Sequence, residues 1–203
     1  MLKIEDLKVS ENKMKFFLKD APASMANAIR RAMMSEVPVM AIDEIDFYEN
    51  TSSMFDEYIS HRMGMIPLTT DLKSYEVADE CCGGNCSKCS VILTLDVQGP
   101  AMVYAKDLKS KDKEIKPVYG DIPIIQLGEG QALRLEAKAI LGRGKQHAKF
   151  QPCLCSYNSQ KTNERNFDFE VESFGNLGPE DLLKAALKIL EKKTGELEDQ
   201  IKK

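Results

Sequence analysis

A helical segment set between two prolines and followed by a strand is the feature of this sequence that most constrains its fold. Apolar residues recur there at intervals of three and four, which is the spacing of one helical face: Met25, Ala28, Ile29, Ala32 and Met33. Asp20 can cap the helix, Pro22 fits its first turn because no N–H is needed there, and Pro38 ends it. The residues that follow alternate around Ile45 and Phe47, which predicts a strand. This stretch therefore predicts a fold that combines helices with a sheet.

Shorter patterns predict the remaining elements. Residues 2–19 alternate on both sides of a polar turn and predict a β-hairpin. Between Met54 and Met63 we expect a second helix, with Phe55, Ile59 and Met63 sharing one face. Apolar or alternating runs predict further strands at 91–97, 122–127, 133–139 and 167–171. Together these elements favour the α+β fold class.

The last predicted helix starts near Pro179 and carries a wide apolar stripe. Its seam steps by four and three positions, as in a heptad pattern: Leu183, Leu187, Leu190, Thr194, Leu197 and Ile201. Leu182, Ala186 and Ile189 make the stripe wider than a lone surface helix needs. The helix is therefore expected to lie in a core or to meet a partner.

The composition excludes several classes of protein. The chain has 203 residues, a net charge of -4 and a pI of about 5.4, whereas proteins that mainly grip phosphate backbones are usually basic. No apolar run is long enough to span a bilayer, and the N-terminus lacks the apolar core of a signal peptide. His61 beside Asp56 and Glu57 is more typical of a solvated helix face than of acid–base machinery. We therefore expect a cytoplasmic, non-catalytic protein without membrane contacts.

Four of the six cysteines cluster between Cys81 and Cys89, too closely for a disulfide framework. Cys86 and Cys89 form a C-x-x-C pair, and the short turn of such a pair brings two thiolates to one ion. Gly83 and Gly84 give the backbone the freedom to wrap around a metal. The pattern favours a tetrahedral Zn²⁺ site, and the alternative is a flexible loop of reduced thiols without metal.

Two blocks of this sequence resemble a known family. They are ANAIRRAMMSEVPVMAIDEI, which starts at Ala26, and DEYISHRMGMIPL, which starts at Asp56. Both look like the archaeal members of an RNA polymerase family that includes the third-largest subunit of eukaryotic RNA polymerase II. The N-terminal domain of the bacterial alpha subunit is a more distant member.

The resemblance implies a discontinuous architecture. A dimerisation domain of residues 1–40 and 160–203 would consist of a sheet and two helices. A mostly β domain of residues 41–159, with a cysteine-rich loop at 80–90, would interrupt it.

The resemblance also implies a function. It implies a non-catalytic assembly subunit of an archaeal multisubunit DNA-directed RNA polymerase, which pairs with the small subunit L. This platform would then recruit subunit N and the second-largest catalytic subunit, and would reach DNA only through the assembled complex. The residues expected to meet subunit L are Met25, Ile29, Met33, Leu183, Leu187, Leu190 and Leu197. Arg30, Arg31 and His147 match positions that face the large subunits, and the alternative is that they are ordinary surface residues.

The eukaryotic members of the family have a four-cysteine zinc loop, which this sequence resembles in part. Cys82, Cys86 and Cys89 match three of its ligand positions, whereas the fourth falls on Glu80, with Cys81 beside it. We expect Zn²⁺ to be held by Cys81 and the three matched cysteines, with Glu80 as the alternative fourth ligand. A rival interpretation is a stand-alone zinc-binding module for nucleic acid or protein, which would show a salt-dependent affinity for DNA.

Many archaeal members of the family carry an inserted domain with iron–sulfur clusters. By the resemblance, it falls before the last strand, where this chain has only the polar stretch Asn158–Asn166. We expect a loop there and no cluster, because the stretch has no apolar periodicity. Cys153 and Cys155 are expected on a strand, pointing to opposite faces, and two thiols cannot supply the four ligands of a cluster.

Overall fold

The computed structural model describes residues 2–84, 86–160 and 163–202. The chain divides into two compact units, one of Met1–Val37 with Arg143–Lys203 and one of Pro38–Gly142. The first unit is therefore built from both ends of the chain, and the second is inserted into it. The fold is mixed, with mostly antiparallel strands and three α-helices among the described residues.

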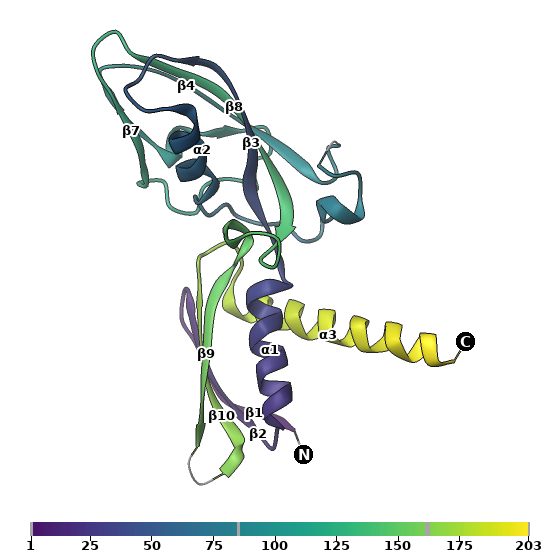
Figure 1. Cartoon of the computed structure of the whole chain (residues 1–203). Helices are drawn as coiled ribbons and strands as arrows, with labels where there is room; N and C mark the ends of the chain where they lie inside the picture. Colours follow the sequence, from purple (N-terminus) through teal and green to yellow (C-terminus); the bar gives the residue numbers. More distant parts are fainter. Residues whose placement is uncertain (1, 85, 161–162, 203) are drawn as a thin grey trace. The chain divides into compact units, whose positions relative to one another are not determined.

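Unit 1 is a four-stranded antiparallel sheet with two helices on one face (Figure 1). Its strand order is β1-β2-β10-β9, and the strands are β1 (Lys3–Val9), β2 (Lys13–Lys19), β10 (Asn163–Ser173) and β9 (Cys153–Gln160). The helices are α1 (Ala23–Ser35) and α3 (Pro179–Ile201). The short 3-10 turn η3 (Ala148–Phe150) precedes β9.

The core of unit 1 follows from the alternation of its strands. Every second residue of β2 and β10 is buried, and the rings of Phe16 and Phe169 stack with their centroids 4.7 Å apart. α1 covers this face with Ala26, Ile29, Ala32 and Met33, and α3 adds Leu182, Leu183 and Ala186. Large, fully buried side chains dominate this cluster, so its packing stabilises the pairing of the chain's two ends.

Three expectations about the end of the inserted segment are wrong. The predicted boundary at residue 160 is too late, because β9 pairs with β10 and belongs to unit 1. The expected loop Asn158–Asn166 is largely strand, since β9 runs to Gln160 and β10 starts at Asn163; residues 161–162 lie outside the described residues. Cys153 and Cys155 point to the same face, because residues two apart on a strand do, and both are buried in the core of unit 1.

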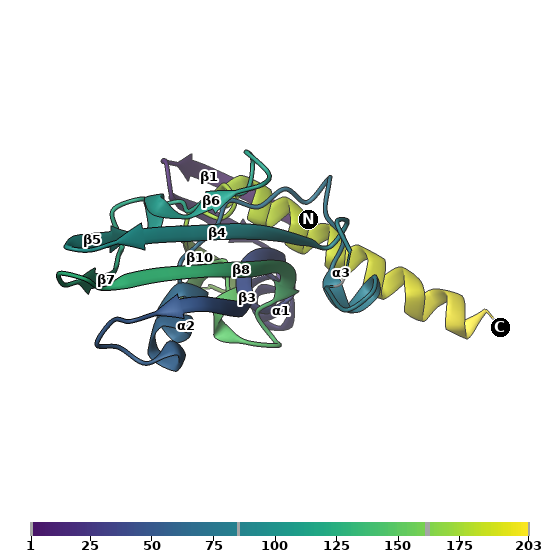
Figure 2. The same ribbon diagram turned by 90° about the horizontal axis from the view of Figure 1, so that it is seen from above.

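Unit 2 is built on a second antiparallel sheet of order β3-β8-β4-β6, seen from above in Figure 2. Its strands are β3 (Pro38–Asn50), β8 (Ala132–Arg143), β4 (Ser90–Gln98) and the two-residue β6 (Lys109–Ser110). β5 (Ala101–Tyr104) and β7 (Pro123–Leu127) form a separate pair, and η1 (Ala78–Glu80) and η2 (Ala105–Asp107) are 3-10 turns.

The helix α2 (Asp56–Gly64) packs on the core of unit 2 through Ile59 and Met63. Phe55, predicted on the same face, is instead 72% exposed, because the chain enters the helix in an extended conformation at this residue. Among the described residues no helix is long and apolar enough to cross a membrane.

Candidate functional site

The loop between η1 and β4 brings four thiols together. The ligand atoms of Cys81, Cys82, Cys86 and Cys89 all lie within 4.8 Å of one another. The sulfur atoms of Cys81 and Cys86 are 3.5 Å apart, those of Cys82 and Cys89 are 3.5 Å apart, and those of Cys86 and Cys89 are 3.6 Å apart. Four ligands at about 2.3 Å from a tetrahedral ion lie about 3.8 Å from one another. The four thiols therefore fit a metal ion.

The backbone of the loop is shaped for this grouping. Gly83 and Gly84 have φ values of +70° and +88°, a region that favours glycine, and Gly83 N–H donates to Ala78 at 2.8 Å. In the turn from Cys86 to Cys89, the carbonyl of Cys86 accepts hydrogen bonds from the backbone N–H groups of Cys89 and Ser90. The turn that joins Cys86 to Cys89 is thus held independently of any ion.

The thiols differ in their readiness to lose a proton. Hydrogen bonds from the Cys82 thiol and the Lys88 N–H lower the pKa of Cys86 to about 6. The hydrogen bond to Cys86, with burial as the next cause, raises the pKa of Cys81. Cys86 is therefore better prepared than Cys81 to bind a cation as a thiolate. Glu80, the alternative fourth ligand, is not among the residues that the described chain gathers here, whereas Cys81 is.

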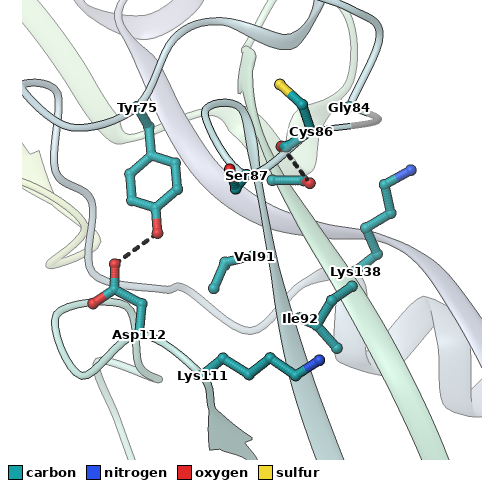
Figure 3. A pocket seen from close by; sticks show the side chains of 10 residues that line it. Tyr75, Gly84, Cys86, Ser87, Val91, Ile92, Lys111, Asp112 and Lys138 are labelled. Atoms are coloured by element: carbon teal, nitrogen blue, oxygen red, sulfur yellow. Dashed lines mark hydrogen bonds between the residues drawn. The ribbon is translucent and has the colours of Figure 1, made fainter.

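A cleft of about 560 Å³ lies beside the cysteine loop (Figure 3). Tyr75 and Asp112 lie together on one side, where the phenol donates to the carboxylate at 2.6 Å. Burial and this bond raise the pKa of Tyr75. Lys138 lies on the opposite side, and the Lys111 side chain runs below Ile92 in this view. The cleft thus combines two lysines with an apolar floor.

The residues expected to meet a small partner subunit are divided by the structure. Ile29, Met33 and Leu183 are buried in the chain's own core, so the expectation that they form a partner surface is wrong for these three. Met25 and Leu187 are each 39% exposed, and Leu197 is 60% exposed. Leu190 is half-buried and lines a cavity of about 290 Å³ between α1 and α3. The exposed residues of the predicted stripe, Met25, Leu187 and Leu197, are therefore not covered by the described part of the chain.

The three predicted large-subunit contacts all lie in unit 1. Arg30 is half-buried and donates to Asn27 at 3.0 Å, whereas Arg31 is exposed. His147 is exposed and accepts a hydrogen bond from Lys149 N–H at 3.1 Å, so it caps η3. The structure gives His147 a local structural role that its sequence did not indicate.

The sequence patterns did not predict one exposed apolar surface of unit 1. Apolar residues on and before the edge strand β1 are 44–50% exposed: Leu2, Ile4, Leu7 and Val9. In the β1–β2 pairing, Ile4 lies opposite Leu18 and Val9 lies opposite Met14. Leu18 and Met14 are buried in the core, so the exposed side chains of Ile4 and Val9 lie on the same face of the sheet as the core. The alternation of the first hairpin was the available signal, but the pattern cannot tell a covered apolar face from an open one.

Comparisons with known proteins agree with one another. Residues 41–153 match the family model of the RNA polymerase Rpb3/RpoA insert domain. Over 156 residues the chain is 46% identical to DNA-directed RNA polymerase subunit Rpo3 of Pyrococcus furiosus, a match that covers 77% of this chain and 58% of that relative. Rpo3 of Archaeoglobus fulgidus is 46% identical over 160 residues, which cover 77% and 61%.

A further relative is matched over more of its length. Rpo3 of Methanocaldococcus jannaschii is 43% identical over 174 residues, which are 85% of this chain and 82% of the relative. The chain thus spans about three-fifths of the Pyrococcus and Archaeoglobus relatives but most of the Methanocaldococcus one.

Proposed function

This chain belongs to the RNA polymerase Rpb3/RpoA family, and we propose that it is a non-catalytic assembly subunit of an archaeal DNA-directed RNA polymerase. The proposed partner in a heterodimer is the small subunit L. The pair would form the platform to which subunit N and the second-largest catalytic subunit bind, with DNA reached only through the complex. Catalysis of nucleotide addition belongs, in this proposal, to the large subunits.

The observation that supports this role best is the uncovered apolar surface of unit 1. Leu187, Leu197 and Ile201 are exposed along α3, the last of them by 85%. The exposed row on β1 adds a second apolar strip to the same unit. Exposed apolar area of this extent is typical of a surface that a partner covers. We propose that subunit L packs against α3 and β1, with Met25 and Leu190 at the junction of α3 with α1.

We further propose that the cysteine loop holds one Zn²⁺ through Cys81, Cys82, Cys86 and Cys89. The bound ion would crosslink the loop and would take no part in a reaction. A site with four protein ligands is closed, which is typical of structural rather than catalytic zinc. Arg30, Arg31 and His147 remain the proposed contacts to the large subunits, with Arg31 and His147 exposed enough to make them.

Co-expression tests the assembly proposal. The full chain, produced with a subunit L and separately with an unrelated small protein, should elute as a one-to-one heterodimer only with subunit L. Produced alone, it should self-associate, because its apolar surface then has no cover. A monomeric chain that ignores subunit L would contradict the proposal. A salt-dependent affinity of the isolated chain for DNA would instead favour a stand-alone nucleic-acid module.

A further inference from the structure

We propose that the hydrogen bond between Tyr75 and Asp112 anchors the first arm of the cysteine loop, residues 75–82. The anchor would hold Cys81 and Cys82 in place before a metal ion binds, which makes Tyr75 a positioning residue for two of the four thiols. The inference rests on the proposed zinc site, because it concerns how that site is assembled. The contacts that support it all lie within unit 2.

The two arms of the loop are held in different ways. The second arm, from Cys86 onward, has its own turn at the Cys86 carbonyl and continues into β4. In the first arm, Cys81 and Cys82 are exposed. The N–H groups of Cys81 and Gly83 both donate to the carbonyl of Ala78, at 3.2 Å and 2.8 Å. These two bonds tie the thiols to Ala78, so the placement of the thiols depends on what fixes the base of the arm.

The base of the first arm is attached at three neighbouring residues. Ala78 is buried, and the N–H of Glu76 donates to the carbonyl of Lys88 in the second arm at 2.9 Å. The phenol of Tyr75 donates to the carboxylate of Asp112 at 2.6 Å (Figure 3). The Tyr75 side chain therefore ties the start of the arm to a different loop, which follows β6.

The bond between Tyr75 and Asp112 has the properties of a firm anchor. Tyr75 is half-buried, and its hydrogen bond is the main cause that lowers the pKa of Asp112, so a charged carboxylate accepts the bond at neutral pH. Asp112 is itself held in its loop, because its carboxylate accepts from Glu114 N–H at 3.0 Å and its own N–H donates to Ser110 Oγ at 3.1 Å. An arm held in this way has less conformational freedom to lose when an ion binds.

The same loop is attached to the chain at a second point, which provides a matched control. The Thr69 hydroxyl accepts from Lys116 N–H at 2.9 Å, and Thr69 N–H donates to the carbonyl of Lys116 at 2.8 Å. Thr69 precedes the first arm by several residues. Thr69→Val should therefore weaken the attachment of the loop while the bond between Tyr75 and Asp112 stays in place.

Hydrogen exchange of the metal-free, full chain measures the anchor directly. Tyr75→Phe should speed the exchange of the Cys81 and Gly83 amides about fivefold, because one hydrogen bond that holds the arm is lost. Thr69→Val should leave both rates unchanged.

Competition with a chelator measures the consequence for the metal. Tyr75→Phe should weaken zinc binding about fivefold, because the ion must then order the arm. Asp112→Asn keeps an oxygen acceptor for the phenol and should weaken binding less, and Thr69→Val should not weaken it. The visible spectrum of the cobalt-substituted chain should be the same for all variants, since the four thiols are unchanged.

Both measurements can overturn the proposal. It fails if Tyr75→Phe leaves the exchange of the Cys81 and Gly83 amides unchanged, or if it leaves the zinc affinity of a zinc-binding chain unchanged. It also fails if Thr69→Val has the same effects as Tyr75→Phe, since the bond would then stabilise the fold in general. If the unchanged chain binds no zinc, the zinc proposal falls, and the exchange rates of the metal-free chain decide on the anchor.

Discussion

Lys193 of α3 donates a hydrogen bond to Glu36 at the end of α1, with 2.9 Å between Nζ and Oε1. Lys145 approaches the other carboxylate oxygen at 3.5 Å. Burial alone would raise the pKa of Glu36, but the hydrogen bonds and charges of the two lysines outweigh it and lower the pKa below its usual value of 4.5. This carboxylate therefore links α3 to α1 within unit 1.

Removing that link should make stability less dependent on pH. The folded pKa of Glu36 is depressed, so its contribution is present above pH 4.5 and is lost as pH falls through the folded pKa. Glu36→Gln should lower the free energy of unfolding by about 0.5–1 kcal/mol at neutral pH and by less in acid. Urea unfolding at several pH values measures this. Glu191→Gln, an exposed glutamate of α3, serves as the control and should show no such trend.

The heterodimer should depend on the exposed leucines and not on the buried ones. Leu187→Asp with Leu197→Asp should abolish binding of subunit L without unfolding the chain, because both side chains are already in contact with solvent. Lys192→Asp, on the other side of the helix from this stripe, should leave binding intact. Ile29→Asp should unfold unit 1 instead, since Ile29 is only 3% exposed. Sizing and circular dichroism of each variant distinguish the two effects. A heterodimer that survives the double leucine change would place the interface elsewhere.

The zinc proposal predicts about one ion per chain and identifies its fourth ligand. Cys81→Ser should lower the zinc content or the affinity for zinc, whereas Glu80→Gln should leave both unchanged, because only Cys81 lies with the other thiols. Elemental analysis and competition with a chelator measure this. Without metal, Cys81 and Cys82 should react rapidly because they are exposed, whereas Cys153 and Cys155 should react slowly because they are buried. Equal zinc binding by both variants would assign the fourth position to another ligand.

Protein prepared without oxygen should contain no stoichiometric iron and no iron–sulfur absorption in the visible range. Cys153 and Cys155 are buried on one face of β9, where burial raises the pKa of each thiol to about 12. Thiols that stay protonated and enclosed by core residues are poor ligands for a cluster. Iron analysis beside zinc analysis decides the point. Stoichiometric iron would instead indicate that the cysteine loop holds an iron–sulfur cluster and not zinc.

Local patterns in this sequence determined several of the elements, because those patterns depend on neighbours a few residues away. The spacing from Met25 to Met33 predicted α1, and the alternation at Phe167, Phe169 and Val171 predicted the strand β10. The same was true of the cysteine loop, where close spacing in sequence forces closeness in space. The two blocks beginning at Ala26 and Asp56 also indicated the family that the comparisons show.

Only the tertiary structure decided which apolar surfaces are covered and where the unit boundary falls. Ile29 and Leu187 have the same signature in the sequence, yet one is buried against the sheet and the other is 39% exposed. The stretch Asn158–Asn166 looks like a loop because its polarity hides the pairing of β9 with β10, in which Asn158 lies opposite Asp168. The cleft beside the cysteine loop arises from three loops and two strands, β4 and β8, which are far apart along the chain. Such features depend on long-range packing, which periodicity in one segment does not encode.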